Sequence, residues 1–189
     1  MNRIPLTVPN ILTLFRFALV PVCTILIYFG RMVPALIIYV VACGTDLLDG
    51  YIARKYHMGS QAGVLLDPLA DKLISVFAVI AFTVTDVLPW YVVVTIFVKE
   101  LMMIGGGIFL YFRDIITPAN TFGKIAAFIF NTSVAFTFLH EYVAPWHIWF
   151  ICFALVFMLA SLGQYAYLNM YKKLRQKALK GGEIANRQE

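Results

Sequence analysis

The chain has 189 residues, of which 61% are hydrophobic and 13% are charged, whereas soluble proteins have about 25% charged residues. This composition excludes an ordinary soluble domain and predicts an integral membrane protein with one helical domain. The net charge of +5 does not indicate nucleic-acid binding, because no soluble basic surface is expected on which a duplex could lie.

Apolar runs long enough to cross a bilayer, about 20 residues each, recur along the whole chain. We expect six transmembrane helices, at 10–29, 33–56, 66–86, 89–112, 121–141 and 146–171. The first lacks a small-residue cleavage site, so we expect it to remain in the mature protein. The prediction is an all-α fold with a single catalytic domain over 1–171 and a basic cytoplasmic tail over 172–189.

Lysine and arginine are distributed unevenly between the two sides of the predicted bundle. With the N-terminus inside, the outer loops carry only Arg31. The cytoplasmic side then carries Arg3, Arg54, Lys55, Arg113, Lys124, Lys172, Lys173, Arg175, Lys177, Lys180 and Arg187. Because positive loops stay in the cytoplasm, both termini are predicted to be cytoplasmic, in a bacterial cell membrane and facing anionic lipid head groups.

Four aspartates stand inside the second and third predicted helices. Asp46 and Asp49 are spaced i, i+3, and Asp67 and Asp71 are spaced i, i+4, so each pair shares one helix face. An antiparallel helix pair then gathers all four carboxylates just inside the cytoplasmic interface. The alternative is that they snorkel or cap helices, and Asp67 before Pro68 fits an N-cap. That alternative does not account for the matched spacing of all four.

Four carboxylates at one place in an apolar setting repel one another and lose hydration. The nearby cations Arg54 and Lys72 are too few to compensate them. Two divalent cations would neutralise the four charges, and oxygen ligands suit Mg²⁺ or Mn²⁺. A two-metal cluster also suits displacement at phosphorus. The residues therefore predict a dimetal site for phosphoryl transfer.

Residues 46–71 read D-x2-D-G-x2-A-R-x8-G-x3-D-x3-D. In this signature the chain resembles the CDP-alcohol phosphotransferases, also called CDP-alcohol phosphatidyltransferases, and the likeness extends to its length and six-helix layout. The resemblance implies a membrane enzyme that moves a substituted phosphate from a CDP-linked donor to an alcohol and releases CMP. It also implies a homodimer.

The resemblance also implies a role for each residue of the signature. The four aspartates would hold the two metal ions, and Asp71 would also be the catalytic base for the attacking hydroxyl. The residues that would line the CDP part of the donor are Gly50, Ala53, Arg54 and Gly63.

The opening segment V-P-N-I-L-T-L-F-R, residues 8–16, is similar to the start of phosphatidylglycerophosphate synthases and of cardiolipin synthases that use CDP-diacylglycerol. Asn10, Thr13 and Arg16 are therefore candidates for the mouth of the site. The alternative for Arg16 is a cation that snorkels to the interface.

The fourth predicted helix carries a charged pair, Lys99 and Glu100, and intramembrane ions usually face a cavity or each other. Phosphatidylglycerophosphate synthases typically have arginine at the first position and again eight residues later, where this chain has Gly107. The F-G-K-I-A-A run at 122–127 resembles the start of the fifth helix both in these synthases and in cardiolipin synthases, where Lys124 would bind the acceptor phosphate. Arg113 would reach back from the helix end to replace the missing arginine.

Two acceptors fit this pattern. Glycerol 3-phosphate is a dianion and favours several cations, whereas phosphatidylglycerol carries one charge and two acyl chains, for which the glycines at 105–107 would make room. We predict transfer of the phosphatidyl group from CDP-diacylglycerol to glycerol 3-phosphate, with cardiolipin synthesis from phosphatidylglycerol as the alternative.

A membrane cation carrier is the alternative from a different class. A conduction path needs polar groups distributed through the bilayer, and the aspartates are instead confined to one interface. The sequence therefore favours the enzyme.

Overall fold

The structure is a computed structural model that describes residues 8–56, 61–112 and 121–168. Within these ranges the side chains are described except at 8–11, 46–56, 61–71, 107, 110 and 111. The described residues form helices and turns and no strand, which confirms the all-α prediction.

Six long helices lie on the six predicted apolar segments, and one short helix lies where only a break was expected. The third helix begins at Gln61 instead of residue 66. The helices are α1 (Val8–Tyr28), α2 (Met32–Tyr56), α3 (Gln61–Val84), α4 (Trp90–Tyr111), α5 (Thr121–Thr137), α6 (His140–Val143) and α7 (Trp146–Tyr165).

The helices α1 and α3 end in the same kind of turn. Gly30 follows α1 with φ +69°, and Asp86 follows α3 with φ +58°. Each residue with positive φ closes a pair of backbone hydrogen bonds that satisfies carbonyls of the last helical turn. The bonds run from the N–H groups of Gly30 to Ile27 (2.9 Å), Arg31 to Leu26 (2.8 Å), Asp86 to Thr83 (3.2 Å) and Val87 to Phe82 (2.8 Å).

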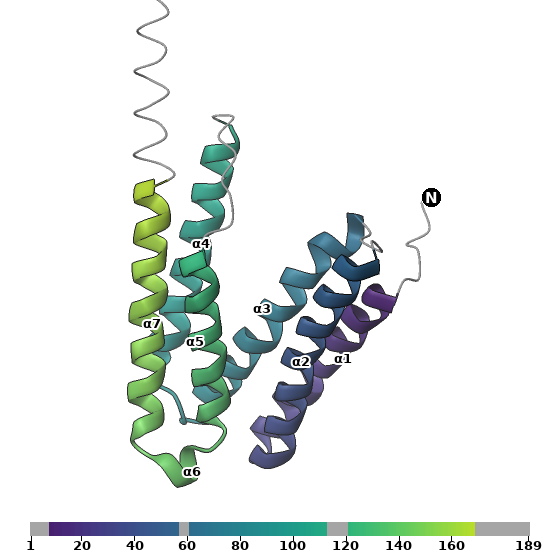
Figure 1. The fold of residues 1–189 in the computed structure, drawn as a ribbon. Helices are drawn as coiled ribbons and strands as arrows, with labels where there is room; N and C mark the ends of the chain where they lie inside the picture. Colours follow the sequence, from purple (N-terminus) through teal and green to yellow (C-terminus); the bar gives the residue numbers. More distant parts are fainter. Residues whose placement is uncertain (1–7, 57–60, 113–120, 169–189) are drawn as a thin grey trace, which may run out of the picture. The chain divides into compact units, whose positions relative to one another are not determined.

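The chain divides into two compact units, of which the first comprises Met1–Val93 and Asn131–Ile151. In this unit α1 packs against both α2 and α3, whereas α2 and α3 touch each other much less (Figure 1). Small residues at the contacts let the helix backbones approach closely. The buried apolar residues of the three helices include Val20, Cys23, Ile27, Ala35, Ala42, Ile74, Ala78 and Phe82.

A buried polar and aromatic cluster joins α2, α3 and the end of α5 within the first unit. The Tyr39 hydroxyl lies 3.1 Å from Ser75 Oγ and donates to the backbone oxygen of Asn131 at 3.4 Å. Ser75 Oγ donates to Asn131 Oδ1 at 2.8 Å. The Tyr39 ring packs against Phe138, with centroids 5.3 Å apart, and Phe138 packs against Phe82 at 4.8 Å.

The second unit comprises Val94–Phe130 and Cys152–Glu189. In this unit the start of α5 packs against α7, since the rings of Phe122 and Phe157 have centroids 4.9 Å apart. A Cβ atom placed on Gly123 would lie 3.6 Å from Ser161 Oγ, an ordinary van der Waals contact. Gly123 on α5 therefore faces Ser161 on α7.

One helical segment among the described residues, Trp146–Leu168, is long and apolar enough to cross a bilayer. The described stretches Leu12–Tyr28, Met32–Thr45 and Lys72–Val84 are apolar and shorter. Six membrane crossings therefore stay a prediction from the sequence.

The turn at Gly30 leads to a prediction about stability. A side chain there has room, because nothing lies within 4 Å of an added Cβ, so Gly30→Ala should cost only the strain of a left-handed backbone, about 1 kcal/mol. We expect a lower melting temperature in detergent. Gly105→Ala is the control, because it adds the same methyl group to open space inside a helix; equal melting temperatures for the two variants would contradict the prediction.

Candidate functional site

The four aspartates lie on two helices of the first unit. Asp46 and Asp49 are on the C-terminal half of α2, and Asp67 and Asp71 are on the first half of α3; their side chains lie outside the described residues. The end of α2 and the start of α3 lie at the same end of the unit (Figure 1). The backbone therefore carries both pairs toward one end, as an antiparallel helix pair requires.

The N-cap interpretation of Asp67 is wrong. The helix α3 begins at Gln61, so Asp67 lies well inside it and Pro68 is not at its first turn. An aspartate inside an apolar helix has no orphan N–H group of the first turn to accept from. Capping therefore does not explain why a carboxylate stands at this position.

Helix α1 buries two polar residues where it meets α2 and α3. The exposed fraction is 0% for Arg16 and 1% for Thr13. Arg16 therefore does not snorkel to the interface, and the alternative based on snorkelling is wrong. The side chain of Asn10 lies outside the described residues, so a site mouth formed with Asn10 stays a prediction.

Arg16 and the four aspartates lie at similar distances from the neighbouring ends of their helices. With a rise of about 1.5 Å per residue, Arg16 lies about 12 Å from the start of α1. The aspartates lie about 10–15 Å from the end of α2 and about 9–15 Å from the start of α3. These three helix ends lie together in Figure 1. The only acidic residues between positions 8 and 84 of the sequence are these four aspartates.

The residues expected along the CDP group have helical backbones. Gly50, Ala53 and Arg54 belong to the last two turns of α2, and Gly63 belongs to the first turn of α3. Their side-chain positions lie outside the described residues. At the described edge of this region, a Cβ atom added to Gly44 would meet nothing within 4 Å, so open space lies beside α2.

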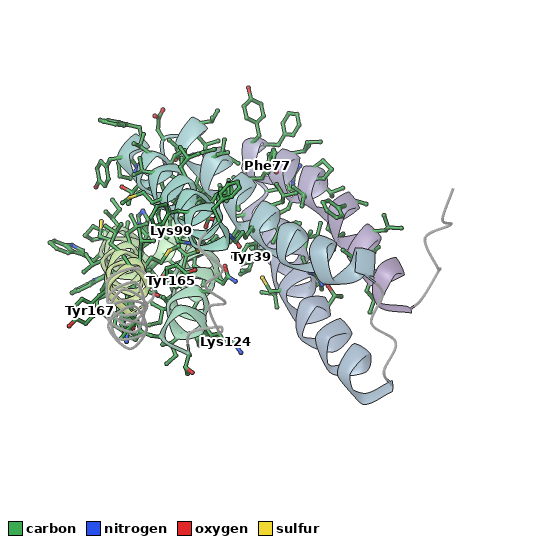
Figure 2. The ribbon with its side chains drawn as sticks, turned by 90° about the horizontal axis from the view of Figure 1, so that it is seen from above. Tyr39, Phe77, Lys99, Lys124, Tyr165 and Tyr167 are labelled. Carbon is green, nitrogen blue, oxygen red and sulfur yellow. The ribbon has the colours of Figure 1, made fainter. Side chains whose placement is uncertain are left out.

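The acceptor residues are less well assembled. Lys99 Nζ lies 2.6 Å from Glu100 Oε1, so the two residues form an ion pair within α4. Pairing with each other was one of the two arrangements expected for these charges. Lys124 is exposed on the first turn of α5, and the two lysines are drawn well apart in Figure 2. Arg113 lies outside the described residues. Nothing described joins these cations into one cluster.

Sequence reasoning missed the polar cluster of Tyr39, Ser75 and Asn131. A signal was present: Ser75 follows Asp71 by four residues, and Tyr39 precedes Asp46 by seven, so both share helix faces with the aspartates. Hydroxyl and amide groups within apolar helices usually hydrogen-bond to a neighbouring helix.

No other described cluster competes as a metal site. Among the residues with described side chains, no three His, Cys, Asp or Glu residues come together. The rings of His140 and His147 meet edge to face with centroids 5.9 Å apart, and two imidazoles without further ligands do not complete a zinc site. The donor set of four carboxylates on α2 and α3 suits hard divalent cations.

The comparisons with known proteins identify the family. The family model described as CDP-alcohol phosphatidyltransferase matches residues 6–160. A Mycobacterium tuberculosis H37Rv protein named as a probable phosphatidylglycerophosphate synthase is 36% identical over 126 residues, which cover 64% of this chain and 60% of that protein. The match therefore spans less than two thirds of the length of that relative.

Two further relatives differ in their names. A Bacillus subtilis CDP-diacylglycerol--glycerol-3-phosphate 3-phosphatidyltransferase is 32% identical over 148 residues, 70% of this chain and 77% of that protein. A Mycobacterium tuberculosis H37Rv protein named "Putative cardiolipin synthase" is 32% identical over 170 residues, 88% of this chain and 79% of that protein. Both candidate acceptors thus occur among the relatives' names.

The burial of Arg16 leads to the second prediction. Arg16→Gln should lower the free energy of unfolding by about 3 kcal/mol or more, because it removes a buried cation from beside the carboxylate-bearing helices. Arg31→Gln is the matched control, because Arg31 is exposed in the turn after α1. Denaturant unfolding of the two variants in detergent measures the difference. A loss of stability no larger for Arg16→Gln than for Arg31→Gln would show that the guanidinium is not part of a charge-compensated cluster.

Proposed function

The chain belongs to the CDP-alcohol phosphatidyltransferase family, and from this membership we propose that it transfers the phosphatidyl group from CDP-diacylglycerol to glycerol 3-phosphate, giving phosphatidylglycerophosphate and CMP. Members of the family use CDP-linked alcohols and an alcohol acceptor, and they are membrane enzymes that generally depend on divalent cations. The observation that carries the proposal is the complete D-x2-D-G-x2-A-R-x8-G-x3-D-x3-D pattern on α2 and α3.

Asp46, Asp49, Asp67 and Asp71 are proposed to hold two divalent cations, Mg²⁺ or Mn²⁺. Carboxylate oxygens fit these ions, and the two pairs of aspartates on α2 and α3 would hold them. When bound, such ions neutralise the pyrophosphate and stabilise the leaving CMP.

The burial of the positively charged Arg16 also supports a cluster of carboxylates nearby. A guanidinium with no exposed surface requires compensation by acceptors or anions. The four aspartates are the acidic residues within helices α1 to α3, so we propose that Arg16 faces their cluster and supplies a fixed positive charge. This charge would hold the carboxylates together while the site exchanges its metal ions.

The other residues of the pattern are proposed to bind the donor and move one proton. The Arg54 guanidinium would donate to the phosphates, and Gly50, Ala53 and Gly63 would let the CDP group approach the helix backbones. Asp71 would accept the proton of the acceptor hydroxyl while the hydroxyl oxygen forms a bond to the phosphorus attached to diacylglycerol. The bond from that phosphorus to the CMP oxygen breaks, and CMP leaves.

For the acceptor we propose glycerol 3-phosphate, held by Lys124 and Arg113 with Lys99 in support. Lys124 is exposed and available to a soluble dianion, whereas Lys99 is already paired with Glu100. Cardiolipin synthesis from phosphatidylglycerol is the second candidate. Open space beside Gly105 and Gly106 favours it, since acyl chains could pass there, and so does the 88% coverage by the relative with that name.

The membrane arrangement is proposed to be six crossings by α1–α5 and α7, with both termini in the cytoplasm and the chain acting as a homodimer. Large apolar side chains on several helices are exposed, as a lipid-facing surface requires; they include Leu14, Ile37, Phe97, Phe128 and Val156. Aromatic residues at the opposite end from the aspartates are also exposed and fit an interfacial belt: Trp90, Tyr142, Trp146 and Trp149. The domain would cover 1–171, and 172–189 would be its cytoplasmic tail.

The dimetal site is tested by replacing each aspartate in turn. Asp→Asn at Asp46, Asp49, Asp67 or Asp71 should abolish CMP release, because it removes a charged metal ligand and transition-state stabilisation together. Asp86→Asn is the control, because Asp86 lies in the turn after α3 and asparagine also tolerates its positive φ. Near-normal turnover in any two of the four site variants would rule out the dimetal assignment. Failure of the wild-type enzyme to release CMP from CDP-diacylglycerol with Mn²⁺ and an alcohol would reopen the cation-carrier alternative.

The acceptor is tested by offering glycerol 3-phosphate and phosphatidylglycerol separately to purified enzyme with CDP-diacylglycerol and Mn²⁺. We expect phosphatidylglycerophosphate as the product, identified by mass spectrometry. Lys124→Ala should raise KM for glycerol 3-phosphate about ten- to a hundredfold, the loss of one charge-assisted hydrogen bond, with little change in KM for the donor. Cardiolipin as the sole product would establish the second candidate instead.

A further inference from the structure

The polar cluster of Tyr39, Ser75 and Asn131, here called the polar bridge, is the starting point. It takes one residue from each of α2, α3 and α5, all within the first unit. Tyr39 is 1% exposed and Ser75 is 3% exposed, so both side chains are buried. Hydroxyl groups in such surroundings depend on their protein partners, because water is not available to replace them.

The hydrogen bonds of the polar bridge connect all three of its members. Ser75 Oγ uses its single proton to donate to Asn131 Oδ1 at 2.8 Å. The Ser75 and Tyr39 hydroxyl oxygens lie 3.1 Å apart, and the Tyr39 hydroxyl also lies 3.4 Å from the Asn131 backbone oxygen, to which it donates. The Tyr39 ring is held by Phe138, at a centroid distance of 5.3 Å, so the position of its hydroxyl is set by packing. Ser75 is the middle member that links α2 to α5 through α3.

The polar bridge lies close to the aspartates along the same helix faces. Ser75 follows Asp71 by one helical turn, a rise of about 6 Å on α3. Tyr39 precedes Asp46 by two turns, a rise of about 10 Å on α2. Residues spaced by four or seven positions share a helix face, so the contact from Tyr39 to Ser75 fixes the mutual rotation and spacing of the two faces that carry the carboxylates.

The packing of the unit gives the polar bridge this role. The helix α1 packs extensively on α2 and on α3, whereas α2 and α3 contact each other much less. Apolar contacts through α1 tolerate small sliding and rotation, but a hydrogen bond at 2.8–3.1 Å does not. Metal coordination by carboxylates from two helices needs their relative position held to about 0.5 Å.

We propose that Tyr39, Ser75 and Asn131 are positioning residues that hold α2 and α3 in the register that the four aspartates need to bind divalent cations. This inference rests on the proposed metal-dependent function. The bridge touches neither substrate nor metal in this assignment. Its loss should weaken metal binding and slow turnover while the affinity for glycerol 3-phosphate stays the same.

The test uses two variants that each remove one hydroxyl, Ser75→Ala and Tyr39→Phe; the second keeps the ring that packs on Phe138. The matched control is Thr83→Val, also on α3, because the Thr83 hydroxyl donates only within its own helix, to the Val79 oxygen at 2.9 Å. Binding of Mn²⁺ to the purified full-length protein in detergent is measured by the electron paramagnetic resonance signal of free Mn²⁺. This readout does not depend on turnover.

We expect Ser75→Ala and Tyr39→Phe to raise the dissociation constant for Mn²⁺ about tenfold, the scale seen when groups that orient metal ligands are lost. Thr83→Val should bind Mn²⁺ like the wild type. In CMP-release assays the first two variants should need more Mn²⁺ for half-maximal rate and show a lower kcat, with an unchanged KM for glycerol 3-phosphate.

Wild-type affinity for Mn²⁺ in both bridge variants would overturn the inference, and so would an equal loss in Thr83→Val, which would reflect general destabilisation. The outcome for the proposed function is separate. If the wild type binds Mn²⁺ and synthesises lipid while the bridge variants are unaffected, only the positioning role of the polar bridge is overturned. If the wild type makes no lipid and the bridge variants bind Mn²⁺ more weakly, the positioning role is supported and the proposed reaction is overturned. No Mn²⁺ binding by the wild type overturns both.

Discussion

Four carboxylates within two apolar helices are the constraint on which the rest of the site depends. In a medium without water each charge loses several kcal/mol of hydration, and neighbouring like charges add to that cost. Such a group can persist only where cations meet it at fixed positions. Arg16, which is buried in the same helix group, is proposed as one such cation, and the proposed divalent ions would supply the rest.

The same constraint explains why the helix group is built as it is. Metal ions and a guanidinium compensate carboxylates only when the helix backbones are held at a constant spacing. Apolar packing through α1 brings α2 and α3 together, with alanines and a cysteine at the close contacts. Directional hydrogen bonds between Tyr39, Ser75 and Asn131 then fix what apolar packing leaves free to slide.

The sequence predicted the helices well because each long helix lies on an apolar run bounded by polar or glycine residues. It placed α1, α2 and α4 within two residues of their observed limits. It placed the start of α3 too late, since residues 61–65 were assigned to the preceding loop although the helix begins at Gln61. The short α6 was missed, because four residues without apolar periodicity give no signal beyond that of a turn.

The spacing of the aspartates in the sequence was enough to predict a shared ligand site. Contacts that depend on tertiary packing could not be predicted in this way. Paired aspartates at i, i+3 and i, i+4 indicate a shared ligand face from the sequence alone. Whether Arg16 lies in the helix group or snorkels is decided by the side of α1 that meets α2 and α3, which no local pattern specifies. The bond from Ser75 to Asn131 joins residues 56 positions apart, and only the tertiary structure shows that they meet.

The identity of the acceptor reduces to a count of available cations. Glu100 already neutralises Lys99 within α4, so a glycerol 3-phosphate dianion at that position would have to compete with a carboxylate held at 2.6 Å. In the proposed function the dianion would then draw its binding from Arg113 and from Lys124, which is exposed on the first turn of α5. A phosphodiester monoanion needs less compensation and would gain from apolar contact along the glycines of α4. The balance between these two acceptors therefore depends on whether Lys124 binds a phosphate.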